Sequence, residues 1–207
     1  MTTTTTSSSP TRRRGRRHGP LLAGVLGLAC TVPAFAAGTE AQRQQAAPCE
    51  ACHGAEGRST TPDTPSLAGQ PKQFITTQLV MFREGNRKSA VMSPMATPLG
   101  NAEINELGGY FAALSPAPAG KPLAADAAAA GRGLADRLFC TQCHGAELQG
   151  QQHIPRLAGQ RAEYLRTQLA GFKAGTRFDM DGNMTAAAQA LTPADIETLA
   201  AWLATLR

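Results

Sequence analysis

Apolar residues at helical spacing mark several segments of this chain. In residues 161–173, Leu165, Leu169 and Phe172 lie three or four positions apart, which predicts a helix. Residues 71–83 are predicted as a helix for the same reason. No stretch shows the strict alternation that is typical of a half-buried strand. The hydropathy pattern therefore predicts an all-α fold.

The last predicted helix has a clear start. Thr192 suits the N-cap, Pro193 the first helical position and Asp195 the first turn. Earlier in the chain, an equivalent helix is expected after Gly100, with Glu103 in its first turn, although glycine is a weaker cap than threonine. The apolar stripe of the last helix consists of Ile196, Leu199, Leu203 and Leu206.

The sequence after residue 36 repeats itself with a period of about 90 residues. Cys49–Glu56 corresponds to Cys140–Glu147, and Leu67–Gln70 corresponds to Leu157–Gln160. This period is too long for a solenoid repeat, but it suits two small duplicated domains.

A Pro-rich segment, residues 115–123, separates the two copies and is predicted to be an extended, fairly stiff linker. We therefore expect two tandem domains, residues 37–114 and residues 124–207. The second domain should begin with an Ala-rich helix over 124–139. The stretch before Cys49 is short and Gln-rich, so the corresponding helix of the first domain should be abbreviated.

Residues 1–36 have the pattern of a cleaved secretory signal peptide. Five arginines between positions 12 and 17 precede an apolar run, Leu21–Ala29, and the small-x-small site Ala34–Ala36. The apolar run is shorter than the ~20 residues that span a bilayer. We expect cleavage after Ala36 and a periplasmic protein. An uncleaved membrane anchor and lipidation at Cys30 remain alternatives.

Cleavage changes the charge of the protein. All 15 acidic residues and 15 of the 20 basic residues lie after position 36, so the mature chain has a formal net charge of zero. The sequence therefore gives no support to a nucleic-acid partner. Aromatic residues make up only 5% of the chain, and two small domains with so few large side chains would bury a modest core without a cofactor.

The motif Cys-x-x-Cys-His occurs twice and is typical of c-type haem attachment. On one helical turn, two thiols can bond two vinyl groups at one edge of a porphyrin, and the adjacent histidine can present its imidazole to the iron. The sequence thus predicts two covalently bound haem c groups. The attaching cysteines would be Cys49, Cys52, Cys140 and Cys143, and the proximal ligands His53 and His144.

Other uses of paired cysteines explain the motif less well. A redox-active dithiol does not account for a histidine at the next position in both copies. A four-cysteine zinc site has its pairs about 15–20 residues apart, far closer than in this chain. Disulfides suit an exported protein, but bridges so short in sequence would stabilise it little.

A sixth iron ligand decides whether each haem is closed. Met92 and Met184 each lie seven residues before a matched leucine, Leu99 and Leu191. Because methionine is a common distal ligand, the repeat predicts Met92 and Met184 as the second axial ligands. The other methionines of the repeat region have no counterpart in the opposite copy: Met81, Met95 and Met180.

Pro65 and Pro155 each precede the matched Leu-Ala-Gly-Gln segment by two residues. A carbonyl near each proline could accept the proximal histidine N–H and fix the ring. A role as an ordinary loop proline stays open.

With these motifs, the chain resembles the dihaem cytochromes c of the cytochrome c4 family over nearly all of its mature length. The resemblance implies two cytochrome c-like domains whose His/Met-ligated haems face each other near the domain interface. It also implies a periplasmic or membrane-associated electron carrier, often acting towards a terminal oxidase.

We therefore expect electron transfer rather than enzymatic catalysis, with an electron-donating and an electron-accepting protein as partners. A peripheral association with the membrane is compatible with this role. Two alternatives remain: a haem-bearing relay subunit of a dehydrogenase complex, and a dihaem peroxidase, which would need one iron that can open.

Overall fold

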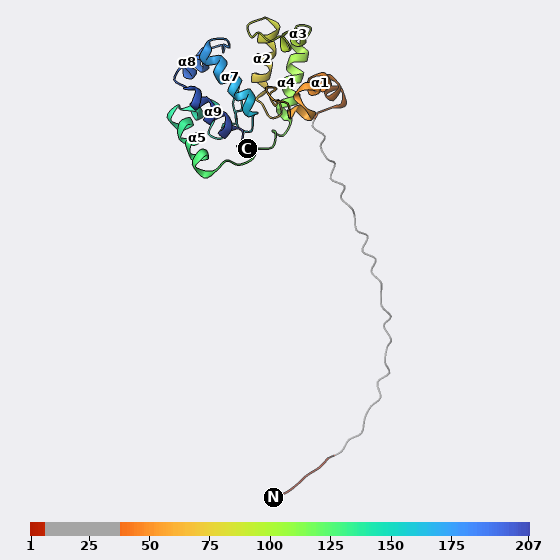
Figure 1. The fold of residues 1–207 in the computed structure, drawn as a ribbon. Coiled ribbons are helices and arrows are strands. Elements are labelled where there is room, and N and C mark those ends of the chain that lie inside the picture. Colours follow the sequence, from red (N-terminus) through yellow and green to blue (C-terminus); the bar gives the residue numbers. More distant parts are fainter. Residues whose placement is uncertain (7–37) are drawn as a thin grey trace. The chain divides into compact units, whose positions relative to one another are not determined.

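The computed structural model describes residues 1–6 and 38–207, and its regular elements are helices (Figure 1). We call residues 38–114 the first half and residues 124–207 the second half. The helices of the first half are α1 (Glu40–His53), the 3-10 turn η1 (Ala55–Gly57), α2 (Lys72–Arg83), α3 (Met92–Ala96) and α4 (Asn101–Ala113). Those of the second half are α5 (Ala125–Arg137), α6 (Cys140–His144), α7 (Ala162–Ala174), α8 (Asn183–Gln189) and α9 (Pro193–Leu203).

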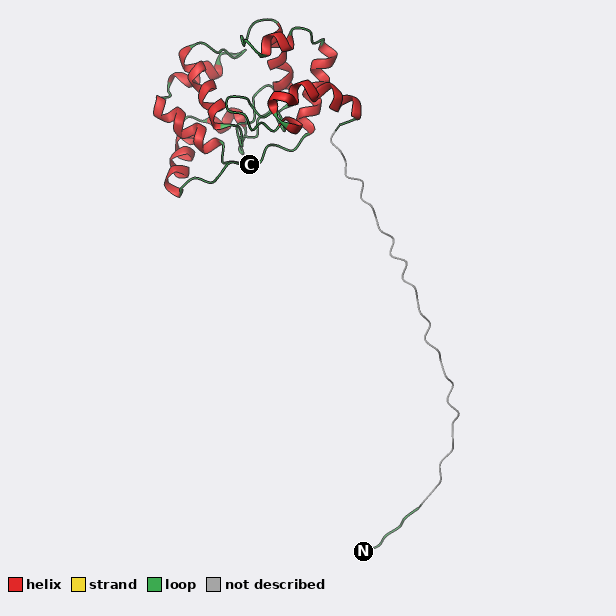
Figure 2. Ribbon diagram, turned by 45° about the vertical axis from the view of Figure 1, so that its right-hand side comes forward, coloured by secondary structure: helices red, strands yellow, loops and turns green. Residues whose placement is uncertain are grey.

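The all-α prediction is confirmed for this part of the chain. Figure 2 shows only helices and loops there, and extended pairing is limited to one isolated bridge between Gln151 and Ile154. None of the helices in the described residues is long and apolar enough to cross a membrane. The predicted signal peptide and its cleavage site after Ala36 fall almost entirely on residues 7–37, outside the described residues.

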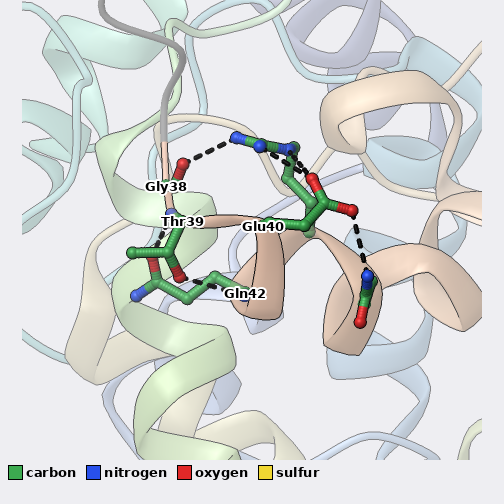
Figure 3. A network of polar contacts seen from close by, with 6 residues as sticks. Gly38, Thr39, Glu40 and Gln42 are labelled. Atoms are coloured by element: carbon green, nitrogen blue, oxygen red, sulfur yellow. Dashed lines mark hydrogen bonds and ion pairs between the residues drawn. The ribbon is translucent and has the colours of Figure 1, made fainter.

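Helix α1 begins at a reciprocal cap that its sequence encodes (Figure 3). The Thr39 hydroxyl accepts from the Gln42 N–H at 3.2 Å, and the Thr39 N–H donates to the Gln42 side chain at 2.8 Å. Arg43 adds a bond to the Gly38 carbonyl at 2.7 Å. The two bonds between Thr39 and Gln42 satisfy N–H groups that the start of a helix leaves without an internal partner.

The predicted helix starts agree with the structure. Helix α9 follows Thr192, whose hydroxyl accepts from the Asp195 N–H at 3.1 Å while Asp195 accepts from the Thr192 N–H at 2.8 Å. Helix α4 follows Gly100, and its cap is one-sided because glycine has no side chain: the Gly100 N–H donates to Glu103 at 2.8 Å. The helices predicted over 71–83 and 161–173 are α2 and α7.

The two cysteine motifs enter their helices differently. In the first half, α1 runs without interruption through the motif to His53. In the second half, α5 ends at Arg137, and Phe139 takes a left-handed conformation with φ 55° before α6 begins at Cys140. The predicted helix over 124–139 therefore ends earlier than expected. The part of α1 ahead of Cys49 is shorter than α5, as the sequence predicted.

Each half has its own buried apolar cluster. In the first half, α4 packs against α1 and α2 and contributes Leu107, Tyr110 and Phe111 to the cluster. In the second half, α9 packs against α5 and α7 and contributes Leu199 and Trp202. The terminal helix of each half is therefore the element around which the others assemble.

Polar contacts join the halves, and residues 38–207 form one compact unit. The side chain of Gln70 bonds the main chain of Arg156, and that of Gln160 bonds the main chain of Ser66. Residues 115–123 connect the halves without forming a helix. The predicted boundaries of the two domains remain a prediction.

The closest approach of α5 to α9 depends on Gly131. A Cβ atom at this position would lie 2.3 Å from Cβ of Trp202, whereas a Cβ at Gly133, in the same helix, would meet nothing nearer than the end of Arg137 at 3.8 Å. The absence of a side chain at Gly131 therefore lets the two helices pack closely.

We predict that Gly131→Ala destabilises the haem-loaded protein by about 1–3 kcal/mol, because the helices must separate to relieve the overlap. Gly133→Ala is the matched control, and it should be neutral or raise stability by roughly 0.5–1 kcal/mol through helix propensity alone. Thermal unfolding of both variants measures the difference. Equal stability of the two variants would contradict the close packing of α5 on α9.

Candidate functional site

The first Cys-x-x-Cys-His motif forms the C-terminal end of α1, and the second makes up the whole of α6. In both motifs the first cysteine is half-buried and the second is exposed, and none of the four forms a disulfide within the described residues. Burial raises the pKa of the Cys49 and Cys140 thiols. A reactive dithiol needs a lowered thiol pKa, so this environment does not favour a redox-active cysteine pair.

Both motif histidines are buried and held by a main-chain carbonyl. His53 Nδ1 lies 2.8 Å from the Pro65 oxygen, and His144 Nδ1 lies 2.8 Å from the Pro155 oxygen. Because a carbonyl oxygen can only accept, Nδ1 carries the proton and Nε2 keeps its lone pair. The structure thus gives the two prolines the role that the sequence suggested for a nearby carbonyl.

Burial also determines the charge of these rings. It lowers the pKa of His53 and of His144, with the bond to the proline carbonyl acting in the opposite direction. Both imidazoles are therefore neutral at neutral pH, which is the form that binds a metal.

A single cavity of about 1360 Å³ brings the predicted site residues together. This volume exceeds the roughly 300–1,000 Å³ of ordinary small-molecule pockets. Apolar side chains from α2, α4, α7 and α9 form much of its wall. The predicted attachment and ligand residues that line it are Cys49, Cys52, His53, Met92, Cys140, Cys143, His144 and Met184.

The methionines divide by their position in the structure. Met92 and Met184 are half-buried and line the cavity. Met95 and Met180 also line it but are 44% and 73% exposed. Met81 belongs to the buried part of α2 and does not reach the cavity.

The first turns of α3 and α8, which carry Met92 and Met184, are anchored by different groups. The Ser89 hydroxyl accepts from the Met92 N–H at 3.1 Å. In the second half, the Asp179 carboxylate accepts from the Met184 N–H at 2.8 Å and from the Thr185 N–H at 3.0 Å. The second methionine therefore lies beside a negative charge that the first one lacks.

Two arginines that the sequence reasoning missed face the same cavity. Arg87 lies over the Phe82 ring at 4.5 Å, and Arg177 lies over the Phe172 ring at 4.4 Å. Both donate to the side-chain oxygen of Gln168, at 2.9 Å and 2.5 Å. The signal that could have found them is the repeat itself, because the two arginines occupy corresponding positions in the two copies.

Within the described residues, neither arginine forms an ion pair with a carboxylate. Arg177 Nε is buried without a hydrogen-bond partner there, and burial lowers the pKa of Arg177 to about 10. Two adjacent cations that form no direct ion pair suit a ligand that carries carboxylates.

These features fit covalently bound haem. The cavity is largely apolar, as a porphyrin requires, paired thiols open onto it, and each buried imidazole has a free Nε2. The arginines are suited to the carboxylates of the propionate groups. Among the described residues, no three His, Cys, Asp or Glu side chains are grouped to hold a metal ion directly.

Comparisons with known proteins agree with this chemistry. The family model for cytochrome c matches residues 128–207. The chain is 39% identical to the thiosulfate dehydrogenase electron acceptor of Thiomonas intermedia, over 77% of this chain and 79% of that protein. It is 34% identical to cytochrome c4 of Pseudomonas aeruginosa, over 88% of this chain and 96% of that protein.

The fold agrees as well. The crystal structure of reduced recombinant cytochrome c4 from Pseudomonas stutzeri superposes with a TM-score of 0.74 at 30% identity, covering 83% of this chain and all of that one. Relatives of this similarity and coverage share both the haem chemistry and the fold. The chain therefore belongs to the cytochrome c4 family, and it is an electron-transfer cytochrome with two covalently bound haem c groups.

Proposed function

We propose that this protein is a periplasmic electron carrier whose two irons are each ligated by one histidine and one methionine. His53 and Met92 ligate the first iron, and His144 and Met184 the second. The supporting observation is that both halves present the same set of groups to one cavity: paired thiols, a buried neutral imidazole with a free Nε2, and a half-buried methionine.

When bound, the haem supplies an iron that cycles between the ferrous and ferric states. The two haem groups would be attached through Cys49, Cys52, Cys140 and Cys143. The carbonyls of the two prolines hold each imidazole in one orientation. Met92 and Met184 would each serve as the second protein ligand of an iron, and a methionine ligand would raise its reduction potential. Because a closed iron leaves no position for a substrate, the proposal is a carrier and not an enzyme. A dihaem peroxidase would need one iron that opens.

The proposed electron donor is a dehydrogenase. This follows the name of the Thiomonas intermedia relative, a thiosulfate dehydrogenase electron acceptor. The proposed acceptor is a terminal oxidase. Export is proposed from the basic, apolar and small-residue pattern of residues 12–36.

The axial methionines can be tested by carbon monoxide binding to the reduced protein. The wild-type protein should contain two low-spin haems that do not bind the gas. Met92→Leu should open one haem and Met184→Leu the other, so that about half of the haem binds the gas in each variant. Absorption spectra, with haem quantified per chain, measure this.

Met95→Leu and Met180→Leu are the matched controls, because these residues line the same cavity but have no counterpart in the other copy. Both control variants should remain closed to the gas. If a control variant opens a haem instead, the ligand assignment in that half is wrong. If the wild-type protein binds the gas, the closed-carrier proposal fails and the peroxidase alternative gains support.

The donor can be tested by rapid mixing. Oxidised protein mixed with a thiosulfate dehydrogenase and thiosulfate should be reduced at both haems, much faster than with thiosulfate alone. Stopped-flow absorption at the haem bands measures this. Reduction at the rate of the thiosulfate-only control would point to a different donor.

Export predicts a defined mature chain. Mass spectrometry of the protein from the periplasmic fraction should give the mass of residues 37–207 plus two haems. A product that retains residues 1–36 in the membrane fraction would instead support the uncleaved anchor.

A further inference from the structure

Gln70 and Gln160 are corresponding residues of the repeat, and both are buried between the halves, with 4% and 5% of their surface exposed. A buried side-chain amide is costly unless its donor and acceptor are both satisfied. In this protein, each amide bonds the main chain of one residue in the opposite half, and the Gln160 oxygen accepts in addition from the neighbouring Arg161 N–H at 3.0 Å. The sequence shows the match between the two glutamines but not this pairing.

The bonds are reciprocal and nearly identical in the two directions. Gln160 accepts from the Ser66 N–H at 2.8 Å and donates to the Ser66 carbonyl at 2.9 Å. Gln70 accepts from the Arg156 N–H at 3.0 Å and donates to the Arg156 carbonyl at 2.9 Å. Each glutamine therefore fixes the main chain of the other half at one residue, on both sides of its Cα.

Ser66 and Arg156 each directly follow the proline whose carbonyl accepts from the motif histidine. The Ser66 N–H and the Pro65 carbonyl belong to the same peptide group, which is planar and rigid. His53 donates to that carbonyl at 2.8 Å, so a continuous series of bonds runs from His53 through the Pro65–Ser66 peptide to Gln160. Hydrogen bonds in series polarise one another.

The second half contains the same series with the partners exchanged. His144 donates to the Pro155 carbonyl at 2.8 Å, and the Arg156 N–H of the same peptide group donates to Gln70 at 3.0 Å. Each series of bonds thus begins at the histidine of one half and ends at the glutamine of the other half: His53 is linked to Gln160, and His144 to Gln70.

We propose that Gln160 is a positioning residue for His53 and that Gln70 is a positioning residue for His144, so that each half sets the reduction potential of the haem in the other. The inference rests on the proposed roles of His53 and His144 as axial ligands. An acceptor on the peptide N–H makes the carbonyl a stronger acceptor for the imidazole N–H. The imidazole becomes more basic at Nε2, and a more basic ligand favours the oxidised iron.

The test replaces each glutamine by methionine, which has a similar length and no amide. In the haem-loaded full-length protein, Gln160→Met should raise the potential of the first haem, and Gln70→Met that of the second. We expect a change of about threefold in the one-electron equilibrium constant, equal to about 28 mV, with the other haem shifted much less. The two variants are controls for each other, because they remove corresponding residues of one interface.

Spectroelectrochemical titration measures the potentials, and the hyperfine-shifted histidine resonances of the oxidised protein report on each ring separately. The two haems are assigned with the Met92→Leu and Met184→Leu variants. If methionine is not tolerated at these buried positions, Gln160→Ala and Gln70→Ala provide the same comparison with a smaller side chain.

The crossed pattern separates positioning from simple loosening of the interface. Equal shifts at both haems, a shift confined to the haem of the mutated half, or no shift in either variant would overturn the inference. Failure of the ligand assignment is recognised independently, because it appears as carbon monoxide binding or a high-spin haem in the wild-type protein.

Discussion

The hydrogen bond from each motif histidine to a proline carbonyl is the interaction on which the rest of each half depends. It fixes the tautomer of the ring, and it ties the end of the motif helix to the loop that leads to α2 or α7. The same loop is anchored a second time. In the first half the Leu67 N–H donates to the Gly57 carbonyl at 2.7 Å, and in the second half the Leu157 N–H donates to the Leu148 carbonyl at 2.8 Å. Both accepting residues are in the left-handed region, at φ 70° and 53°.

This framework explains how a chain with few aromatic residues forms two stable halves. Helices α4 and α9 each supply four large buried side chains, and other apolar side chains, such as Phe82 and Phe172, face the cavity in which both motifs meet. Attached haem completes such a core, because a porphyrin replaces apolar surface that the protein itself does not provide. The cofactor is thus part of the folded structure as well as the redox centre.

The two halves are more alike in the contacts that hold the histidines and the interface than in the residues around each cysteine motif. The histidine bonds, the crossed glutamines and the stacked arginines are matched pairs. The anchors of Met92 and Met184 are not matched, since Ser89 accepts from the N–H of one and Asp179 from the N–H of the other. Near the motifs, the Tyr110 hydroxyl donates to Glu50 at 2.9 Å, and burial together with this carboxylate raises the pKa of Tyr110 to about 12. The residues that correspond to Glu50 and Tyr110 in the second copy are Thr141 and Trp202. The two haem environments are therefore chemically different within one shared architecture.

The sequence by itself determined the fold class, the starts of α4 and α9, the twofold repeat and the residue types that bind haem. These features depend on local spacing, since capping, helical periodicity and the Cys-x-x-Cys-His turn all involve residues within a few positions of one another. It did not reveal the arginine pair, because the convergence of Arg87 and Arg177 on Gln168 requires the two halves to meet. Nor did it reveal the break at Phe139 or the crossed bonds of Gln70 and Gln160. Only the tertiary structure decided the bond from Arg87 to Gln168 and the crossed glutamine bonds, because they join residues far apart in the chain whose pairing depends on how one half packs against the other.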